Sequence, residues 1–354
     1  MKKTLIALAV LGATAGVAHA QSNVTIYGIV DTGYVKESGQ TAYMSENINN
    51  RLGFRGVEDL GGGMKATFEL EQRFDLFNGR NRNVDNDLDA SSGAAGGPNQ
   101  NARRAFDGAA NVGLASKMGA VRFGRVNEIS TETLRQFDPF VQYGVTGMLQ
   151  SNLREVRISN TARYDSPNFA GFNVKGSFSL KNDADVGITA PTVGTAGTPG
   201  IANNGWAVNG NYANGPIAAT VNYNKARNSA DSYNWNVAGG YAFGPARITA
   251  LYEKTNDKAD GYIQKDWLIG ATYKVGAGVI QASYGQDKIN ELDSTDKKFS
   301  LGYTHNLSKR TALYALYSRT EWDANSPVAG YYSGTADLTT DKVNAYQIGM
   351  THKF

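Results

Sequence analysis

The chain has 354 residues, of which 35 are basic, 32 are acidic and none is cysteine. The lack of cysteine excludes a disulfide framework and a thiolate metal site. Without Lys2 and Lys3, which belong to the N-terminal segment, the net charge is about +1. This balance excludes nucleic acid as the main partner, because binding to nucleic acid needs a positive excess that displaces counterions.

Residues 1–20 have the three parts of a secretory signal peptide: a basic start, an apolar stretch and an A-x-A cleavage site that ends at Ala20. We therefore expect the chain to be exported, with 21–354 forming a single transmembrane domain. No apolar run after residue 20 approaches the length of a membrane helix, so membrane-spanning helices are not expected.

Apolar and polar residues alternate in the first predicted strand, 23–36. One face carries Val24, Ile26, Val30 and Tyr34, and the other carries Thr25, Tyr27 and Asp31. Successive side chains of a strand point to opposite faces, so this pattern predicts a two-faced strand. A glycine-rich turn at 60–63 then joins two further predicted strands, 51–59 and 64–74, as a hairpin.

Short and long connections alternate along the rest of the chain. The short ones are 60–63, 116–119, 167–171, 213–216, 244–245, 276–278 and 307–310; the long ones are 37–50, 75–102, 126–155, 181–205, 227–232, 255–264, 288–296 and 320–341. These fifteen connections predict about sixteen strands. Tight turns at one end and long loops at the other are typical of an all-β, antiparallel, up-and-down transmembrane β-barrel.

The later strands show the alternation most clearly. Trp267, Ile269, Ala271, Tyr273 and Val275, for example, alternate with Gly270, Thr272 and Lys274. The apolar faces begin or end in Trp, Tyr or Phe, as aromatic girdles at two membrane interfaces require. A barrel of this size is too wide for side chains to fill, so a polar inner face predicts a water-filled lumen.

The third long connection, 126–155, contains apolar residues that a floppy external loop does not need. Residues 131–137 are expected to form a short helix, capped by Ser130 or Thr131 and stopped before Pro139. Ile129, Leu134, Phe137 and Phe140 provide apolar anchors for it. We therefore predict that this third loop folds inward against the barrel wall.

The final segment, 342–354, reads as a closing strand that pairs with the first strand. Tyr346, Ile348, Met350 and Phe354 share one face, and small or polar residues occupy the other. Such pairing removes both sheet edges.

Several stretches resemble the general porins of β-proteobacteria, the neisserial and Comamonas-like group. They are residues 50–71, 121–125, 162–171 and 306–311, together with Phe354, and the resemblance extends over the whole chain after residue 20. It departs from the family at 106–114, where the family has an uninterrupted Phe-Val-Gly-Leu. The resemblance implies a homotrimer of sixteen-stranded barrels, a pore narrowed by the third loop, and a C-terminal strand that the outer-membrane assembly machinery recognises. It also places the chain among the lipid and lipopolysaccharide of a Gram-negative outer membrane.

The sequence offers little for catalysis or for metal binding, and no cofactor is expected. His305 and His352 lie near tight turns, and Glu69 and Glu71 lie on one strand face with arginines around them. A catalytic pair would need a closed, water-excluding pocket, so a charged wall is the favoured interpretation of these acids. Asp85, Asp87 and Asp89 lack the Gly and Glu of a calcium loop, which leaves a solvated loop, or bridging of divalent cations or lipopolysaccharide, as alternatives.

The predicted function is a passive diffusion channel for ions and small hydrophilic solutes, with a charged constriction. Strand parity predicts a basic wall of Arg51, Arg55, Arg73, Arg104, Arg122 and Arg163. The facing acids are expected to be Glu128, Glu132 and Asp138 of the third loop, beside Glu69 and Glu71 of the wall. Fixed guanidinium charge predicts a preference for anions. A substrate-specific porin, an adhesive or structural barrel, and a hydrolytic barrel remain as alternatives.

Overall fold

The computed structural model describes residues 23–79, 105–148, 156–181, 203–227, 231–259, 261–326 and 342–354. The expected signal peptide, Arg104 and the acids at 85, 87 and 89 lie outside the described residues.

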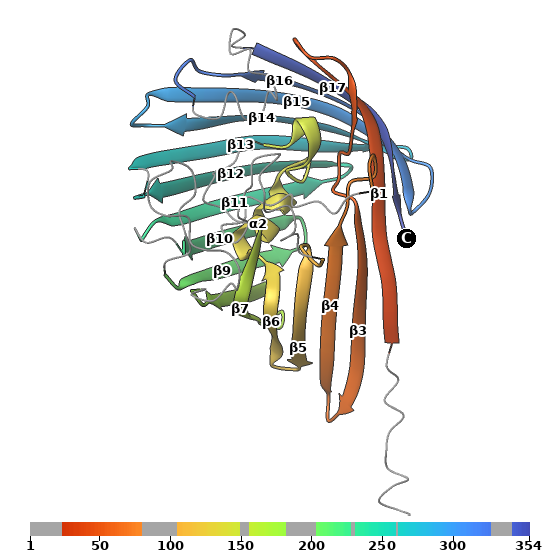
Figure 1. Cartoon of the computed structure of the whole chain (residues 1–354), viewed down its shortest axis with the longest axis vertical. Helices are drawn as coiled ribbons and strands as arrows, with labels where there is room; N and C mark the ends of the chain where they lie inside the picture. Colours follow the sequence, from red (N-terminus) through yellow and green to blue (C-terminus); the bar gives the residue numbers. More distant parts are fainter. Residues whose placement is uncertain are drawn as a thin grey trace, which may run out of the picture.

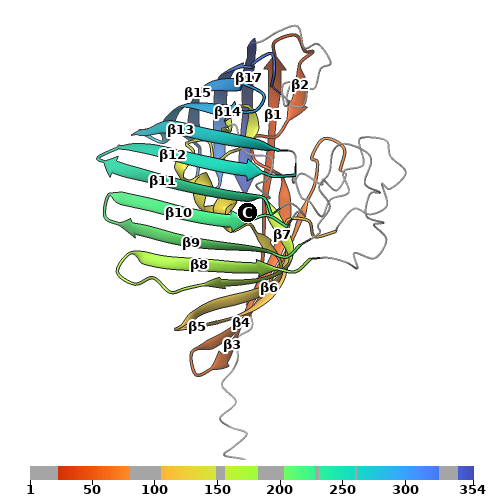
Figure 2. The same cartoon turned by 90° about the vertical axis from the view of Figure 1, so that its left-hand side faces the viewer.

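The described strands wind once around a closed barrel (Figures 1 and 2). They are β1 (Asn23–Glu37), β2 (Tyr43–Ser45), β3 (Arg51–Gly61), β4 (Met64–Arg73), β5 (Ala109–Ser116), β6 (Gly119–Asn127), β7 (Arg157–Asp165), β8 (Phe172–Ser179), β9 (Gly205–Asn214), β10 (Ile217–Lys225), β11 (Tyr233–Phe243), β12 (Ala246–Asp257), β13 (Tyr262–Val275), β14 (Gly278–Ile289), β15 (Ser294–Asn306), β16 (Thr311–Glu321) and β17 (Lys342–Lys353).

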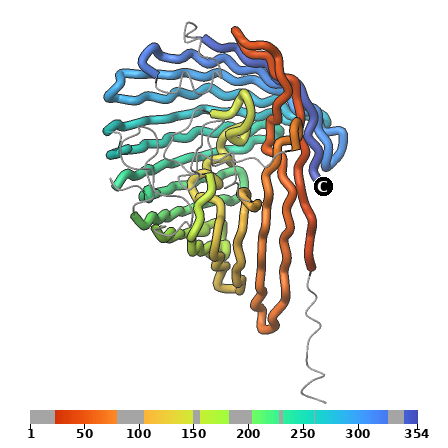
Figure 3. Tube along the Cα trace, in the orientation of Figure 1, coloured from red at the N-terminus to blue at the C-terminus, as the bar shows by residue number. Residues whose placement is uncertain are grey.

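Each strand is antiparallel to its neighbours, and β1 closes the ring by pairing with both β3 and β17. Apart from the three-residue β2, which pairs with Gly33–Val35 of β1, sixteen strands form the wall, as predicted. The backbone of Phe354 exchanges two hydrogen bonds of 3.1 Å with Gly28, so the C-terminus lies beside β1 (Figure 3). The closing strand is therefore confirmed.

All seven tight turns join strands where the sequence predicted them, but two long connections are shorter than expected. β12 and β13 stay paired to Asp257 and Tyr262, and β14 and β15 to Ile289 and Ser294. These strand ends are polar because they extend beyond the apolar band of the barrel as paired strands. Their polarity is the reason that the sequence predicted loops there. β5 begins at Ala109, several residues after the end of the expected connection 75–102.

The two faces of the wall differ as the alternation predicted. Outward residues such as Ile269, Leu301 and Ile348 are 56%, 45% and 66% exposed, whereas their neighbours Leu268 and Gln347 are 2% and 0% exposed. Contacting pairs of aromatic rings follow the long-loop end of the outer face, including Trp206 with Tyr223, Trp235 with Tyr252, and Trp267 with Tyr284. Exposed apolar residues between aromatic girdles are typical of a barrel surrounded by lipid. No helix in the described part of the chain has the length and hydropathy of a membrane span.

Candidate functional site

The third loop folds inward and carries a short helix, as predicted (Figure 1). The helix α2 (Ile129–Leu134) continues into the 3₁₀ turn η1 (Arg135–Phe137), and a second 3₁₀ turn, η2 (Gly144–Thr146), follows. Its N-cap is Glu128 rather than Ser130 or Thr131: the carboxylate accepts from the amides of Ser130 at 2.9 Å and Thr131 at 2.6 Å. These bonds satisfy amides that the first helical turn leaves without partners.

Apolar contacts fix the loop to the inner face of the wall. Leu134 and Phe137 pack with Ala238, Leu251 and Leu268 of β11–β13, and all five side chains are at most 4% exposed. A second cluster joins the loop to β16 through Phe140, Tyr314 and Leu316. Burial of these side chains removes apolar surface from the lumen water and stabilises the inward position.

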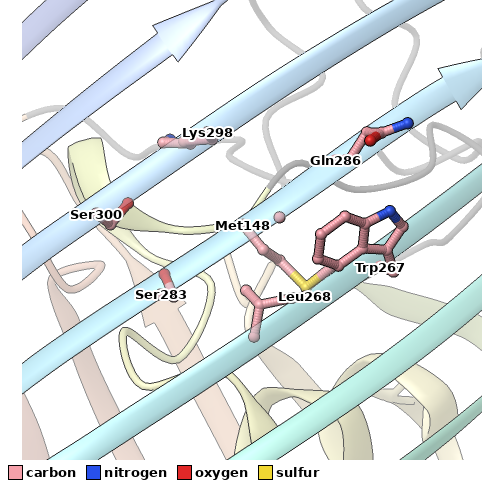
Figure 4. A pocket seen from close by; sticks show the side chains of 8 residues that line it. Met148, Trp267, Leu268, Ser283, Gln286, Lys298 and Ser300 are labelled. Atoms are coloured by element: carbon pink, nitrogen blue, oxygen red, sulfur yellow. The ribbon is translucent and has the colours of Figure 1, made fainter.

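Polar contacts continue this attachment towards β14 and β15. The Gln281 amide donates to the carbonyl of Pro139 at 2.6 Å, and the Ser300 hydroxyl donates to the carbonyl of Thr146 at 3.0 Å. At its far end, Met148 lines a small pocket with Leu268 of β13 and residues of β14 and β15 (Figure 4). The loop thus contacts the wall from α2 to its last described residue.

Asp138 does not face the passage, in contrast to the sequence prediction. It is 3% exposed, and its carboxylate accepts from the amides of Phe140, Gln142 and Met148 at 2.9, 2.9 and 3.1 Å. Burial raises the pKa of Asp138, although these three bonds act in the opposite direction. Glu128 is likewise 1% exposed and serves as the helix cap, so both acids shape the loop instead of lining water.

Glu132 is the loop acid that meets the basic wall. Its carboxylate lies 2.9 Å from the Arg163 guanidinium and 2.6 Å from the Lys175 ammonium. Burial acts to raise the pKa of Glu132, but Arg163, with help from Lys175, lowers it to about 2. Arg163 also pairs with Asp165 at 2.7 Å, and Asp165 pairs with Arg122 at 2.6 Å.

The charge of Arg163 is therefore neutralised by ion pairs within the protein. Its side chain is 0% exposed, and the carboxylates of Glu132 and Asp165 both pair with its guanidinium. The sequence prediction that Arg163 offers its charge directly to ions in the passage is corrected on this point, because the loop covers the side chain.

A second charged group forms around Glu71 of β4. Its carboxylate lies 3.0 Å from Arg73 and 3.7 Å from both Arg51 and Arg157. The hydroxyl of Tyr27 donates to Glu69 at 2.9 Å and to Glu71 at 3.2 Å. Three guanidinium groups surround this one carboxylate, and these contacts favour a charged wall over a catalytic pair of acids.

Arg55 and Arg135 each stack on an aromatic ring. Arg55 is exposed on the inner face of β3, and its guanidinium lies 5.2 Å from the centre of the Tyr27 ring. Arg135 of η1 lies 4.8 Å from the centre of the Tyr143 ring. Burial acts to raise the pKa of Tyr143, yet the positive charge of Arg135 and Arg51 lowers it to about 8.

Acids line the inner face across the barrel from this basic wall, on strands β12 to β15. Glu253, Asp266, Asp287 and Asp296 are direct register neighbours on successive strands, and all are at most 5% exposed. Strand parity alone places this row on the inner face, although the acids predicted from the sequence were only those of the third loop together with Glu69 and Glu71.

Arg157, Lys175 and Asp165 were also missed as members of the site. Arg157 directly follows the predicted third loop, and Lys175 shares its face with Ser177 and Ser179, so parity again carried the signal. The histidines have ordinary partners: His305 hydrogen bonds with the Tyr303 hydroxyl at 3.1 Å, and His352 with the Thr311 hydroxyl at 2.9 Å. Within the described ranges, no three His, Cys, Asp or Glu side chains are grouped as metal ligands.

Comparisons with known proteins agree with this architecture. The family model of the Gram-negative porins matches residues 7–325. Outer membrane porin protein 32 of Delftia acidovorans is 31% identical over 388 aligned residues that cover all of both chains. Major outer membrane protein P.IB of Neisseria meningitidis is 29% identical over 198 residues, about half of each chain (52% and 51%).

Solved structures show the same fold. An anion-selective porin from Comamonas acidovorans has a TM-score of 0.73 and 25% identity, with 94% of this chain and 100% of that chain covered. An outer membrane protein of Vibrio cholerae, OmpT with loop L8 deleted, has a TM-score of 0.66 at 15% identity, with 94% of this chain and 99% of that chain covered, and supports the fold alone. The chain therefore belongs to the Gram-negative porin family and forms a porin channel of the outer membrane.

Proposed function

We propose that this porin is a passive, water-filled channel for ions and small hydrophilic solutes, and that its basic wall gives it a preference for anions. The exposed position of Arg55 on the inner face carries this proposal. No ion pair involves Arg55 within the described part of the chain. Arg51 and Arg122 support it from the same wall, with side chains 15% and 26% exposed.

Fixed positive charge at a narrow passage raises the local concentration of anions. A guanidinium group keeps its charge at any working pH, so the effect persists across physiological conditions. The similar Comamonas acidovorans structure is described as an anion-selective porin, which favours the same sign here. The buried acids on β12–β15 oppose this field, and a mild to marked preference is the expected result.

The test is the zero-current potential of single channels in a salt gradient across a planar bilayer. The wild-type channel should show ohmic current steps without added substrate, and a potential of the sign that anion preference requires. Arg55→Ser should shift that potential towards cation preference, because it removes an exposed charge without leaving a buried acid unpaired.

Arg319→Ser is the matched control. Arg319 is also exposed, but it lies on the outer face of β16 beside Glu321 at 3.0 Å. This control should leave the potential unchanged. A cation-selective wild type, or an Arg55→Ser channel with an unchanged potential, would refute the anion preference. Silence in the bilayer, together with hydrolytic activity, would instead favour the enzymatic alternative.

We further propose that the channel is a homotrimer and has no catalytic role. The contacting aromatic rings of the outer face belong to β8–β17, and none of the described pairs involves the outer face of β3–β6. Exposed Phe68, Val112 and Phe123 occupy that face. Subunit contact there would cover these exposed side chains. The terminal strand, with Tyr346, Ile348, Met350 and Phe354 exposed on its outer face, is proposed to be recognised by the assembly machinery.

A further inference from the structure

Three lysines on neighbouring strands form a row on the outer face of the barrel. Lys254 of β12 is the direct register partner of Lys265 of β13, and Lys265 is the partner of Lys288 of β14. Each side chain is partly exposed. Direct partners on one face of an antiparallel sheet have Cβ atoms about 5 Å apart, so three like charges in register destabilise the bare wall.

The residues next to the lysines in the sequence confirm that the lysines occupy the outer face. Their chain neighbours Glu253, Asp266 and Asp287 are 0%, 0% and 5% exposed on the inner face. Two residues from the lysines, Tyr252 and Trp267 lie in the outward aromatic girdle. Two residues of extended strand span about 7 Å, so the lysines lie just beyond the girdle at the long-loop end.

Two other cations near the long-loop end have an acidic partner, in contrast to this row. Lys225 lies 2.7 Å from Asp231, and Arg319 lies 3.0 Å from Glu321. Among the described residues, no carboxylate lies within 4.0 Å of Lys254, Lys265 or Lys288. The nearby carboxylate of Glu291 accepts instead from the backbone amide of Ile263 at 2.6 Å.

We propose that Lys254, Lys265 and Lys288 bind the phosphate groups of a phosphorylated glycolipid in the outer leaflet. Long loops of outer-membrane barrels face the cell exterior, so this level coincides with the headgroups of that leaflet. Lysine binds phosphate as a point charge, and three ammonium groups in register match a headgroup with more than one phosphate. The indole of Trp267 lies directly below the row, where its N–H and ring suit the boundary between headgroup and acyl chain.

This proposal rests on the outer-membrane location of the porin and is independent of ion selectivity. The competing explanation is that the positive charge of the lysines only compensates the negative charge of the acids on the inner face of the same strands. In that case, neutralising them would alter barrel stability without changing lipid affinity.

The test measures lipid binding by the purified full-length protein in detergent, with native mass spectrometry as the readout and bisphosphorylated lipid A as the probe. The variant replaces all three lysines with glutamine. Its affinity should fall on the order of a hundredfold at low salt, because each lysine near an anionic membrane surface contributes a factor of about five. Replacing the three lysines with arginine should keep the affinity near that of the wild type.

A matched control removes three cations at the tight-turn end: Lys117→Gln, Lys309→Gln and Arg310→Gln. It changes the net charge equally and should leave lipid A binding intact. Unaltered single-channel conductance of the glutamine variant would show that it is folded; if it does not fold, Lys265→Gln alone tests the central position. Equal binding of lipid A by the glutamine variant, or equal binding of dephosphorylated lipid A by the wild type, overturns the proposal.

Discussion

The arginines of the inner face differ in what their guanidinium groups contact. Arg163 is enclosed by Glu132 and Asp165, whereas Arg55 stacks on Tyr27 and is exposed. A paired, buried guanidinium contributes to stability and cancels acid charge, while an exposed one acts on passing ions. Anion preference is therefore a property of a few residues and does not follow from the total number of arginines.

Tyr143 should make the anion preference of the channel depend on pH. Its pKa is lowered to about 8 by Arg135 and Arg51, so its hydroxyl loses a proton as pH rises through that value. The phenolate then adds negative charge to the basic group. We expect anion preference, measured as the zero-current potential from about pH 6 to about pH 9.5, to decrease as pH rises. Tyr143→Phe should abolish that step, and the same pH dependence in both channels would contradict this assignment.

The third loop is fixed to the inner face of the wall. Apolar clusters, the bonds from Gln281 and Ser300, and the ion pairs of Glu132 hold it at separate points along its length. Separate anchors restrain different parts of the loop, so losing one loosens a segment and leaves the others in place.

Glu132→Gln tests the charged anchor. Loss of the carboxylate leaves Lys175 with Asp165 alone, at 4.0 Å, and removes one of the two acids that pair with Arg163, so the loop should loosen at α2. We expect noisier single-channel current and a loss of roughly 1–3 kcal/mol of stability, read from denaturant unfolding in detergent. Glu58→Gln, at an exposed position of β3, is the control and should behave as wild type.

The same anchor has a defined pH window. The folded pKa of Glu132 is about 2, below its ordinary value of 4.5. A lowered carboxyl pKa contributes stability that is fully present above 4.5 and is lost as pH falls towards 2. Current noise of the wild type should therefore rise over that range, and the Glu132→Gln channel should change less. Equal changes in both would point to another acid.

The closing strand is the second element whose role can be tested. The ring of Phe354 lies so close against Gly28 that an added Cβ at residue 28 would clash with it. Deletion of Phe354 removes this contact and both backbone hydrogen bonds to Gly28. We expect lower outer-membrane levels of folded, heat-modifiable protein, measured by gel mobility. Normal levels after the deletion would remove the support for its role in assembly.

The alternation of apolar and polar residues predicted the barrel well, because the face on which a strand residue lies is decided by its nearest neighbours in the sequence. The faces of β1 and β17, the seven tight turns and the apolar anchors of the third loop all followed from it. Distances between the loop and the wall depend on tertiary packing, and the alternation of residues along a strand carries no information about that packing. For this reason the burial of Glu128, Asp138 and Arg163 could not be predicted, although their positions in the chain were known.

The proposed trimer assigns different roles to opposite sides of the barrel. Val112 on β5 and Ile269 on β13 are both outward residues, 58% and 56% exposed. Tryptophan is compatible with lipid at either position, but at Val112 its bulk would separate packed subunits. Val112→Trp should therefore lower the temperature at which trimers dissociate on a semi-native gel, while the barrel's β-sheet spectrum stays unchanged. Ile269→Trp is the matched substitution on the lipid-facing side and should leave that temperature as in the wild type. Equal dissociation temperatures for all three proteins would show that β5 does not face a neighbouring subunit.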